Sequence, residues 1–291
     1  MEKYGYAFWE GFSGMLQWTW RSIVMDVPWY TNYFWGLILI SLLVWALEIR
    51  FPWRREQPIL RKDFWLDALH MFFNFFLFAL AIAGVYKVLG TLLAELGISA
   101  RSLAVLDLSH WPMGLQLLVF FLLLDFLQWA THVLLHRIPA LWEFHKVHHS
   151  VKEMGFAAHM RFHWMENILY KPLKTLGVML LGGFEPEQAY IVHFAAIAIG
   201  HFNHANIKLT YGPLKYILNN PVMHLYHHAY TLPEGTHGVN YGISLSLWDY
   251  IFKTDHIPES SGKGPLGFPG DSEIPNSFLG QQTHGFGKRK K

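Results

Sequence analysis

Long uncharged runs of apolar residues divide the first half of the chain. The runs at residues 33–47, 64–89 and 113–135 are long enough, with their flanks, to cross a bilayer as helices, which takes about 20 residues each. The third run carries one acid, Asp125, near its middle. The pattern therefore predicts about three transmembrane helices.

A fourth apolar region, residues 175–200, has a different pattern. Two stretches of roughly a dozen residues each, too short for two full spans, are separated by the sequence GGFEPEQ at residues 182–188. We expect a helical hairpin that dips into the bilayer and returns. A single kinked span is the alternative.

The distribution of basic residues orients these segments. Five Lys or Arg residues lie in the loop at residues 50–62, whereas the loop at residues 90–112 has only Arg101. Because basic residues near spans are retained in the cytoplasm, we expect the first loop and everything after the third span to lie on the cytoplasmic side. Residues 1–32, which mix charges with aromatic side chains, are interpreted as an interfacial segment.

Composition narrows the choice of function. The 291 residues are 52% apolar and 15% charged, and a formal net charge of +2 gives no basic field for binding nucleic acid. There is no cysteine, which excludes disulfide frameworks, zinc ribbons and iron–sulfur clusters. The 18 histidines are unusual in so apolar a chain.

Most of these histidines form short clusters with helical spacing. The clusters are HVLLH, HKVHH and HLYHH, with histidines at His132, His136, His145, His148, His149, His224, His227 and His228. Spacings of three and four residues place imidazoles on one face of a helix, where each cluster presents them to a common point. Isolated histidines such as His70 and His193 are interpreted as hydrogen-bonded packing residues, but three clusters indicate a dinuclear metal centre.

The order of the three clusters after membrane spans resembles the fatty acid hydroxylase and sterol desaturase superfamily of integral membrane diiron enzymes. LWEFHKVHHS (residues 141–150) is similar to the second histidine box of the family. MRFHWMEN (160–167) is similar to its arginine-histidine-x-x-glutamate stretch, with Trp164 where proline is usual. LWDYIFKTD (247–255) is similar to its closing segment, with Lys253 in place of glycine. The resemblance covers roughly residues 113–256.

The resemblance implies that the eight box histidines are metal ligands, and that His204 is a further one, with no catalytic side chain beyond the ligands. Further ligands, or hydrogen-bond partners that orient the imidazoles, are expected among His201, His237, His163, Asp125, Gln128, Asp249 and Glu166. Asp125 precedes His132 by two helical turns, and a buried acid in a span is usually functional.

Imidazole ligands suit zinc, copper, iron or nickel, so the residues alone leave the metal open. The resemblance implies two iron ions that activate O2 to hydroxylate or desaturate a C–H bond of a lipid taken from the bilayer. Zinc could replace iron in a purified sample. Because the chain has no dinucleotide-binding motif and no haem or iron–sulfur signature, a separate electron-donor redox protein is expected.

The expected fold is therefore an all-α integral membrane protein, with about three transmembrane helices and a membrane-dipping hairpin, capped by a cytoplasmic helical histidine-box domain. Its parts are residues 1–32 (interfacial), 33–131 (transmembrane), 132–256 (catalytic, with the hairpin at 175–200) and 257–291 (a loosely ordered tail rich in Gly, Pro and Ser). A bacterial inner membrane and the endoplasmic reticulum fit equally. The alternatives are a membrane metal transporter and a metal-binding protein without oxygenase activity.

Overall fold

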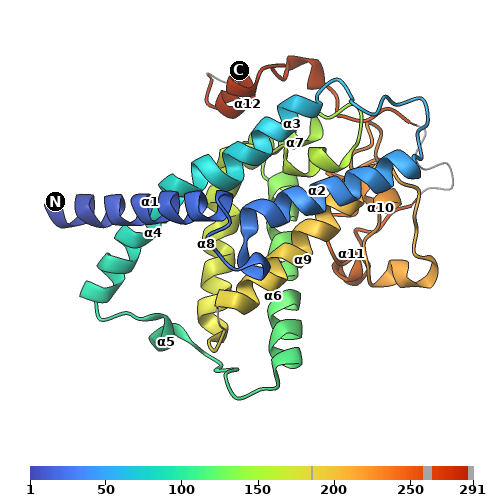
Figure 1. Cartoon of the computed structure of the whole chain (residues 1–291). Helices are drawn as coiled ribbons and strands as arrows, with labels where there is room; N and C mark the ends of the chain where they lie inside the picture. Colours follow the sequence, from blue (N-terminus) through green and yellow to red (C-terminus); the bar gives the residue numbers. More distant parts are fainter. Residues whose placement is uncertain (185, 258–263, 288–291) are drawn as a thin grey trace.

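The computed structural model describes residues 1–184, 186–257 and 264–287, and these form no β-strand (Figure 1). The helices are α1 (Glu2–Ile23), α2 (Tyr33–Arg50), α3 (Phe64–Phe72), α4 (Phe78–Glu95), α5 (Ala100–Leu103), α6 (Met113–Arg137), α7 (Pro139–His149), α8 (Trp164–Leu181), α9 (Pro186–His204), α10 (Pro221–His227), α11 (Leu247–Phe252) and α12 (Phe278–Thr283). A π-helical segment, Phe73–Leu77, joins α3 to α4, and short 3₁₀ turns lie at Trp29–Thr31, Phe156–Met160, Gly212–Tyr216 and Asp271–Glu273. The all-α class is confirmed.

Three helical stretches are long and apolar enough to cross a membrane, and they coincide with the three predicted runs. They are Tyr33–Arg50 (18 residues), Phe64–Glu95 (32 residues) and Met113–Arg137 (25 residues). Their large apolar side chains are widely exposed, as at Leu39 and Leu43 of α2, which are 67% and 60% exposed. Such a surface is stable against lipid and not against water, so the chain is an integral membrane protein.

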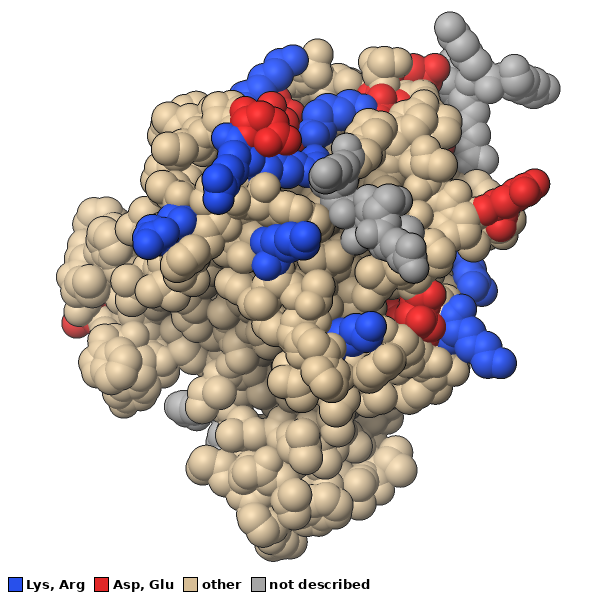
Figure 2. Space-filling model, turned by 90° about the vertical axis from the view of Figure 1, so that its right-hand side faces the viewer, with Lys and Arg blue, Asp and Glu red and all other residues tan. Residues whose placement is uncertain are grey.

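On the face seen in Figure 2, charged side chains gather in the upper part. Viewed from the side of α10 and α11, Lys, Arg, Asp and Glu cover the upper part, whereas the lowest part shows only uncharged residues (Figure 2). The lowest part holds the start of α6 and the turn between α8 and α9 (Figure 1).

The basic loop at residues 51–63 lies next to the end of α9. The amide of Trp53 donates to the Asn206 carbonyl (2.8 Å), and the amide of Arg54 donates to the Asn206 side-chain oxygen (2.9 Å). Because Asn206 follows α9 directly, this loop lies at the same end of the spans as the histidine-bearing helices.

The region predicted as a hairpin consists of two helices rather than one kinked span. The first helix, α8, begins before residue 175, and the second, α9, ends after residue 200. The turn between them starts with Gly182 and Gly183, which have φ of +50° and +78°. A Cβ on Gly183 would lie 2.4 Å from the Ser109 amide nitrogen, so the turn can pack closely on the loop before α6. Entry of the pair into the bilayer stays a prediction.

The N-terminal segment forms one long helix, α1, which packs along α4. The ring of Phe8 fills the space beside Gly84, and ion pairs join Lys3 to Glu95 and Lys87 to Glu10. Its interfacial position stays a prediction.

The expectation of a loosely ordered tail is wrong for residues 264–287, which fold back onto the helices. Side chains of α12 are buried: the Gln281 side-chain oxygen lies 2.9 Å from His70 Nε2, and the Gln282 side-chain oxygen accepts from the Trp164 amide (3.0 Å). Leu266, Phe268 and Ile274 are buried as well, so the tail docks by both hydrogen bonds and apolar contacts. Residues 258–263 and 288–291 lie outside the described residues.

Candidate metal centre

Nine buried histidines from four helices and the residue after α10 form two compact groups. The first group is His132, His136, His145, His149 and His227, and the second is His148, His204, His224 and His228. Within each group the candidate ligand nitrogens lie within 4.8 Å of one another. The sequence predicted all nine as metal ligands.

Helix geometry explains how the clusters divide. In α7, His145 and His149 enter the first group, while His148 enters the second. Residues four apart differ by about 40° around the helix axis, whereas His148 lies about 100° from His149. The structure therefore differs from the expectation that each cluster aims at one point: only the i, i+4 pairs do, and the remaining histidine reaches the other group.

Backbone carbonyls hold most of the rings in place. The Nδ1 atoms of five histidines lie at hydrogen-bond distance from main-chain oxygens: His132 from Tyr241 (2.7 Å), His136 from His237 (3.1 Å), His148 from Arg161 (3.0 Å), His204 from Gly200 (2.7 Å) and His227 from Val239 (2.6 Å). A carbonyl only accepts, so each Nδ1 carries the proton and each Nε2 carries a lone pair.

The lone pairs then face one another. His148 Nε2 lies 3.4 Å from His204 Nε2, and both rings donate through Nδ1. In the first group, Nε2 of His136, His149 and His227 is buried and has no hydrogen-bond partner among the described residues. Facing lone pairs and unpartnered buried nitrogens are unfavourable unless a cation lies between them, so the donors fit bound metal ions.

Burial keeps these rings neutral, as metal binding requires. It lowers the pKa of His148 to about 3, and it lowers the pKa of His149 and His228 well below their ordinary value. Neutral imidazole donors suit iron, zinc, copper and nickel, and groups of five and four ligands could each hold one ion.

Two of the predicted acids support the groups. Glu166 Oε2 lies 2.9 Å from His145 Nδ1, in direct contact with a histidine of the first group. Asp249 does not contact a histidine itself. Its carboxylate accepts from the amides of Tyr241 (2.9 Å) and Gly242 (2.8 Å). It thereby fixes the Tyr241 carbonyl that orients His132.

Asp125 and Gln128 lie elsewhere, contrary to expectation. The Asp125 carboxylate accepts from the Trp248 indole (2.9 Å) and the Ser244 amide (3.2 Å), so it anchors the start of α11. Gln128 accepts from Lys174. Asp125 does lie on the same face of α6 as His132, but its carboxylate binds the Trp248 indole instead of a histidine.

The other three candidate histidines lie outside both groups. His201 contacts Ser41 Oγ (3.1 Å) and His159 Nδ1 (2.9 Å). The His163 ring accepts from the Met165 amide at the start of α8. His237 has an exposed side chain, and only its backbone carbonyl reaches the first group.

A buried ion cluster supports the second group and was not predicted. Asp67 of α3 pairs with Arg161 and Arg61, all three at most 4% exposed, and the Arg161 carbonyl holds His148. The sequence feature that could have predicted this cluster was Asp67, an acid within a membrane span. No sequence feature could have predicted the role of the carbonyls of residues 237–241, because every residue type has a backbone carbonyl.

Comparison with known proteins agrees with this centre. Residues 117–254 match the fatty acid hydroxylase family. An ornithine lipid hydroxylase of Rhizobium tropici is 31% identical over 181 residues, which are 62% of this chain and 53% of that protein. An alkylglycerol monooxygenase of Danio rerio is 27% identical over 256 residues, 82% of this chain and 50% of that protein.

The human alkylglycerol monooxygenase is 30% identical over 142 residues, 46% of this chain and 29% of that protein. The matches thus span about half or less of the length of these relatives. No solved structure matches the chain.

Proposed function

We propose that the chain belongs to the fatty acid hydroxylase and sterol desaturase superfamily, and that it is an O2-dependent diiron oxidoreductase that hydroxylates an unactivated C–H bond of a membrane lipid. The observation that carries the proposal is the pair of buried groups of neutral imidazoles with inward Nε2 atoms. The names of the relatives are those of enzymes that act on lipids, and the apolar helices would place this chain in the bilayer, where lipids are found.

Each histidine group would hold one iron ion, and the ions would supply the activation of dioxygen and the oxidation of the C–H bond. The protein's own part is to hold the nine neutral rings so that each offers a ring nitrogen to one of the two groups. The carbonyls of Tyr241, Val239 and Arg161 fix three of them, and burial keeps water from the donors. Electrons would come from a separate donor protein.

The basic loop at residues 51–63 favours a cytoplasmic centre in a bacterial inner membrane or the endoplasmic reticulum. A metal transporter fits less well, because the nine histidines collect at one end of α6 instead of lining a path along it.

The test uses one histidine from each group. We expect His148→Ala and His227→Ala to lower product formation at least ~100-fold, since losing a ligand costs no less than losing an outer partner of one. The measurement is mass spectrometry of lipids from cells with and without the chain, which should detect the gain of one oxygen.

His110→Ala, at an exposed histidine outside both groups, is the matched control and should leave product unchanged. Membrane fractionation checks that every variant inserts. Undiminished product in His148→Ala contradicts the proposal, and a loss of two hydrogens instead of a gain of oxygen replaces hydroxylation by desaturation.

A further inference from the structure

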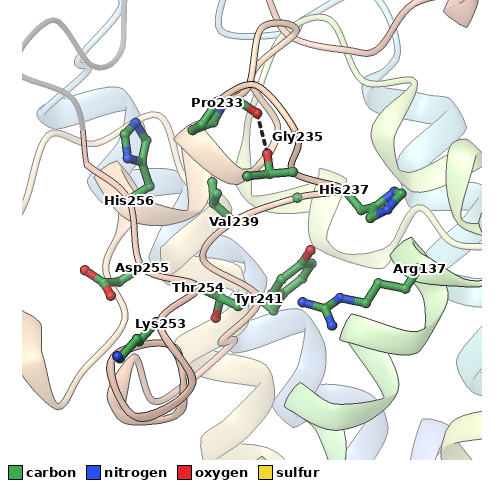
Figure 3. Close-up of a pocket in the computed structure, with 12 residues that line it drawn as sticks. Arg137, Pro233, Gly235, His237, Val239, Tyr241, Lys253, Thr254, Asp255 and His256 are labelled. Carbon is green, nitrogen blue, oxygen red and sulfur yellow. Dashed lines mark hydrogen bonds between the residues drawn. The ribbon is translucent and has the colours of Figure 1, made fainter.

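A pocket of about 250 Å³ lies beside the histidine centre (Figure 3). Its walls come from Arg137 at the end of α6, from the loop at residues 233–241, and from residues 253–256 after α11. The loop is shared with the metal centre, because the carbonyls of His237, Val239 and Tyr241 contact histidines of the first group on its other side.

The two cations of this pocket have no carboxylate partner among the described residues. Arg137 and Lys253 are exposed, and in the described part of the chain neither forms an ion pair. Figure 3 shows the Arg137 guanidinium beside the Tyr241 hydroxyl, with Lys253 and Asp255 at the opposite side. The pocket thus offers two cations to an anionic group and one carboxylate to an ammonium group.

The pocket lies at the level expected for the membrane surface. Arg137 is the last residue of a candidate span. Directly before Lys253, Ile251 and Phe252 are 54% and 51% exposed, and Phe252 stacks on Trp129 of α6 with ring centroids 4.6 Å apart. A basic residue at a span end beside exposed apolar side chains is typical of the level of lipid headgroups.

The volume limits the ligand. Sites that enclose whole drug-sized molecules measure about 300–1,000 Å³. A smaller polar pocket suits a headgroup, whose acyl chains would lie outside against the apolar residues of α11.

We propose that this pocket binds the headgroup of a bilayer lipid through its phosphate or carboxylate. Arg137 and Lys253 hold the anionic group, and Asp255 holds an ammonium group in zwitterionic lipids. The assignment rests on the pocket's charge and position and does not depend on oxygenase chemistry.

Calorimetric titration of the full chain in detergent tests the assignment with four soluble probes: dihexanoyl phosphatidylglycerol, dihexanoyl phosphatidylethanolamine, uncharged dihexanoylglycerol and inorganic phosphate. We expect the double variant Arg137→Gln/Lys253→Gln to bind both phospholipids about tenfold more weakly or worse, as the loss of a charge-assisted hydrogen bond predicts. Asp255→Asn should weaken only the phosphatidylethanolamine probe.

Lys208→Gln, an exposed lysine outside the pocket lining, is the matched control and should bind like the parent chain. Metal content checks that each variant keeps its fold. If the double variant does not fold, the single Lys253→Gln must itself weaken binding by about threefold.

Equal phospholipid affinity in the parent and the folded variants overturns the proposal. Inorganic phosphate binding as tightly as the lipids, with the same loss in the double variant, overturns the lipid assignment in favour of a free-anion site. Dihexanoylglycerol binding as tightly as the phospholipids shows that the acyl chains, not the pocket, provide the affinity.

Discussion

Glu166 differs from the other acceptors that hold the histidine rings. The five carbonyl acceptors are neutral, whereas Glu166 brings a carboxylate to His145. Burial raises the pKa of Glu166 to about 8, although the hydrogen bond from the His163 amide acts in the opposite direction. A cation bound at His145 would favour the charged carboxylate, so the ring and the acid would strengthen metal binding together.

Replacing Glu166 should therefore weaken metal binding more than it weakens the fold. We expect Glu166→Ala to lower metal affinity about 10- to 100-fold and Glu166→Gln to lower it less, because the amide oxygen still accepts from Nδ1. Metal content after dialysis against graded chelator measures this. Glu273→Gln changes an exposed acid and serves as control; unchanged metal retention in Glu166→Ala would show that the contact is incidental.

The histidines and Asp125 show which features of the site could be predicted from the sequence. Spacing identified the eight box histidines, because helical periodicity is a local property, and the family resemblance added His204. Spacing could not divide His145 from His148, since that depends on where α9 and α10 place His204 and His227. Asp125 was misplaced for the same reason: its contact with Trp248 joins residues 123 positions apart.

At the scale of elements, α3 is linked to the second histidine group by buried charge. Asp67 pairs with Arg161, which also contacts Asp63, and the arginine's carbonyl orients His148. A buried ion pair is costly to break, because the remaining charge stays in a medium of low dielectric.

Asp67→Ala should accordingly lower the free energy of unfolding by about 3–5 kcal/mol, since the buried Arg61 loses its carboxylate partner and the buried Arg161 keeps only Asp63. Unfolding in graded denaturing detergent is the measurement. The matched control is Glu95→Ala, which breaks the exposed pair with Lys3 and should have no detectable effect. Equal effects of the two variants would refute the structural importance of the buried cluster.

At the scale of the whole molecule, the tail joins parts that the sequence treats as separate. Gln282 donates to His70 Nδ1 (2.9 Å) on the second span and accepts from Trp164 at the start of α8. Hydropathy located the spans, because lipid exposure makes them uniformly apolar. It missed this docking, because the buried apolar residues of the tail, such as Leu266 and Phe268, and the two amide side chains follow no regular period.

Gln281→Ala/Gln282→Ala should therefore destabilise the chain by roughly 1–3 kcal/mol for each buried polar group left without a partner, such as the His70 ring and the Trp164 amide. The same detergent unfolding assay applies. Gln17→Ala, at an exposed glutamine of α1, is the control. A double variant as stable as the parent chain would mean that the tail packs on the helices without supporting them.

The division of α7 and α10 between the two histidine groups has a consequence for how a two-ion centre would fill. His145 and His148 share one helix but belong to different groups, as do His224 and His227. If each group holds one ion, the first ion bound would fix the rotation of both helices and so place ligands for the second. Metal uptake would then be cooperative, and metal limitation would lower the number of complete centres instead of leaving many half-filled ones.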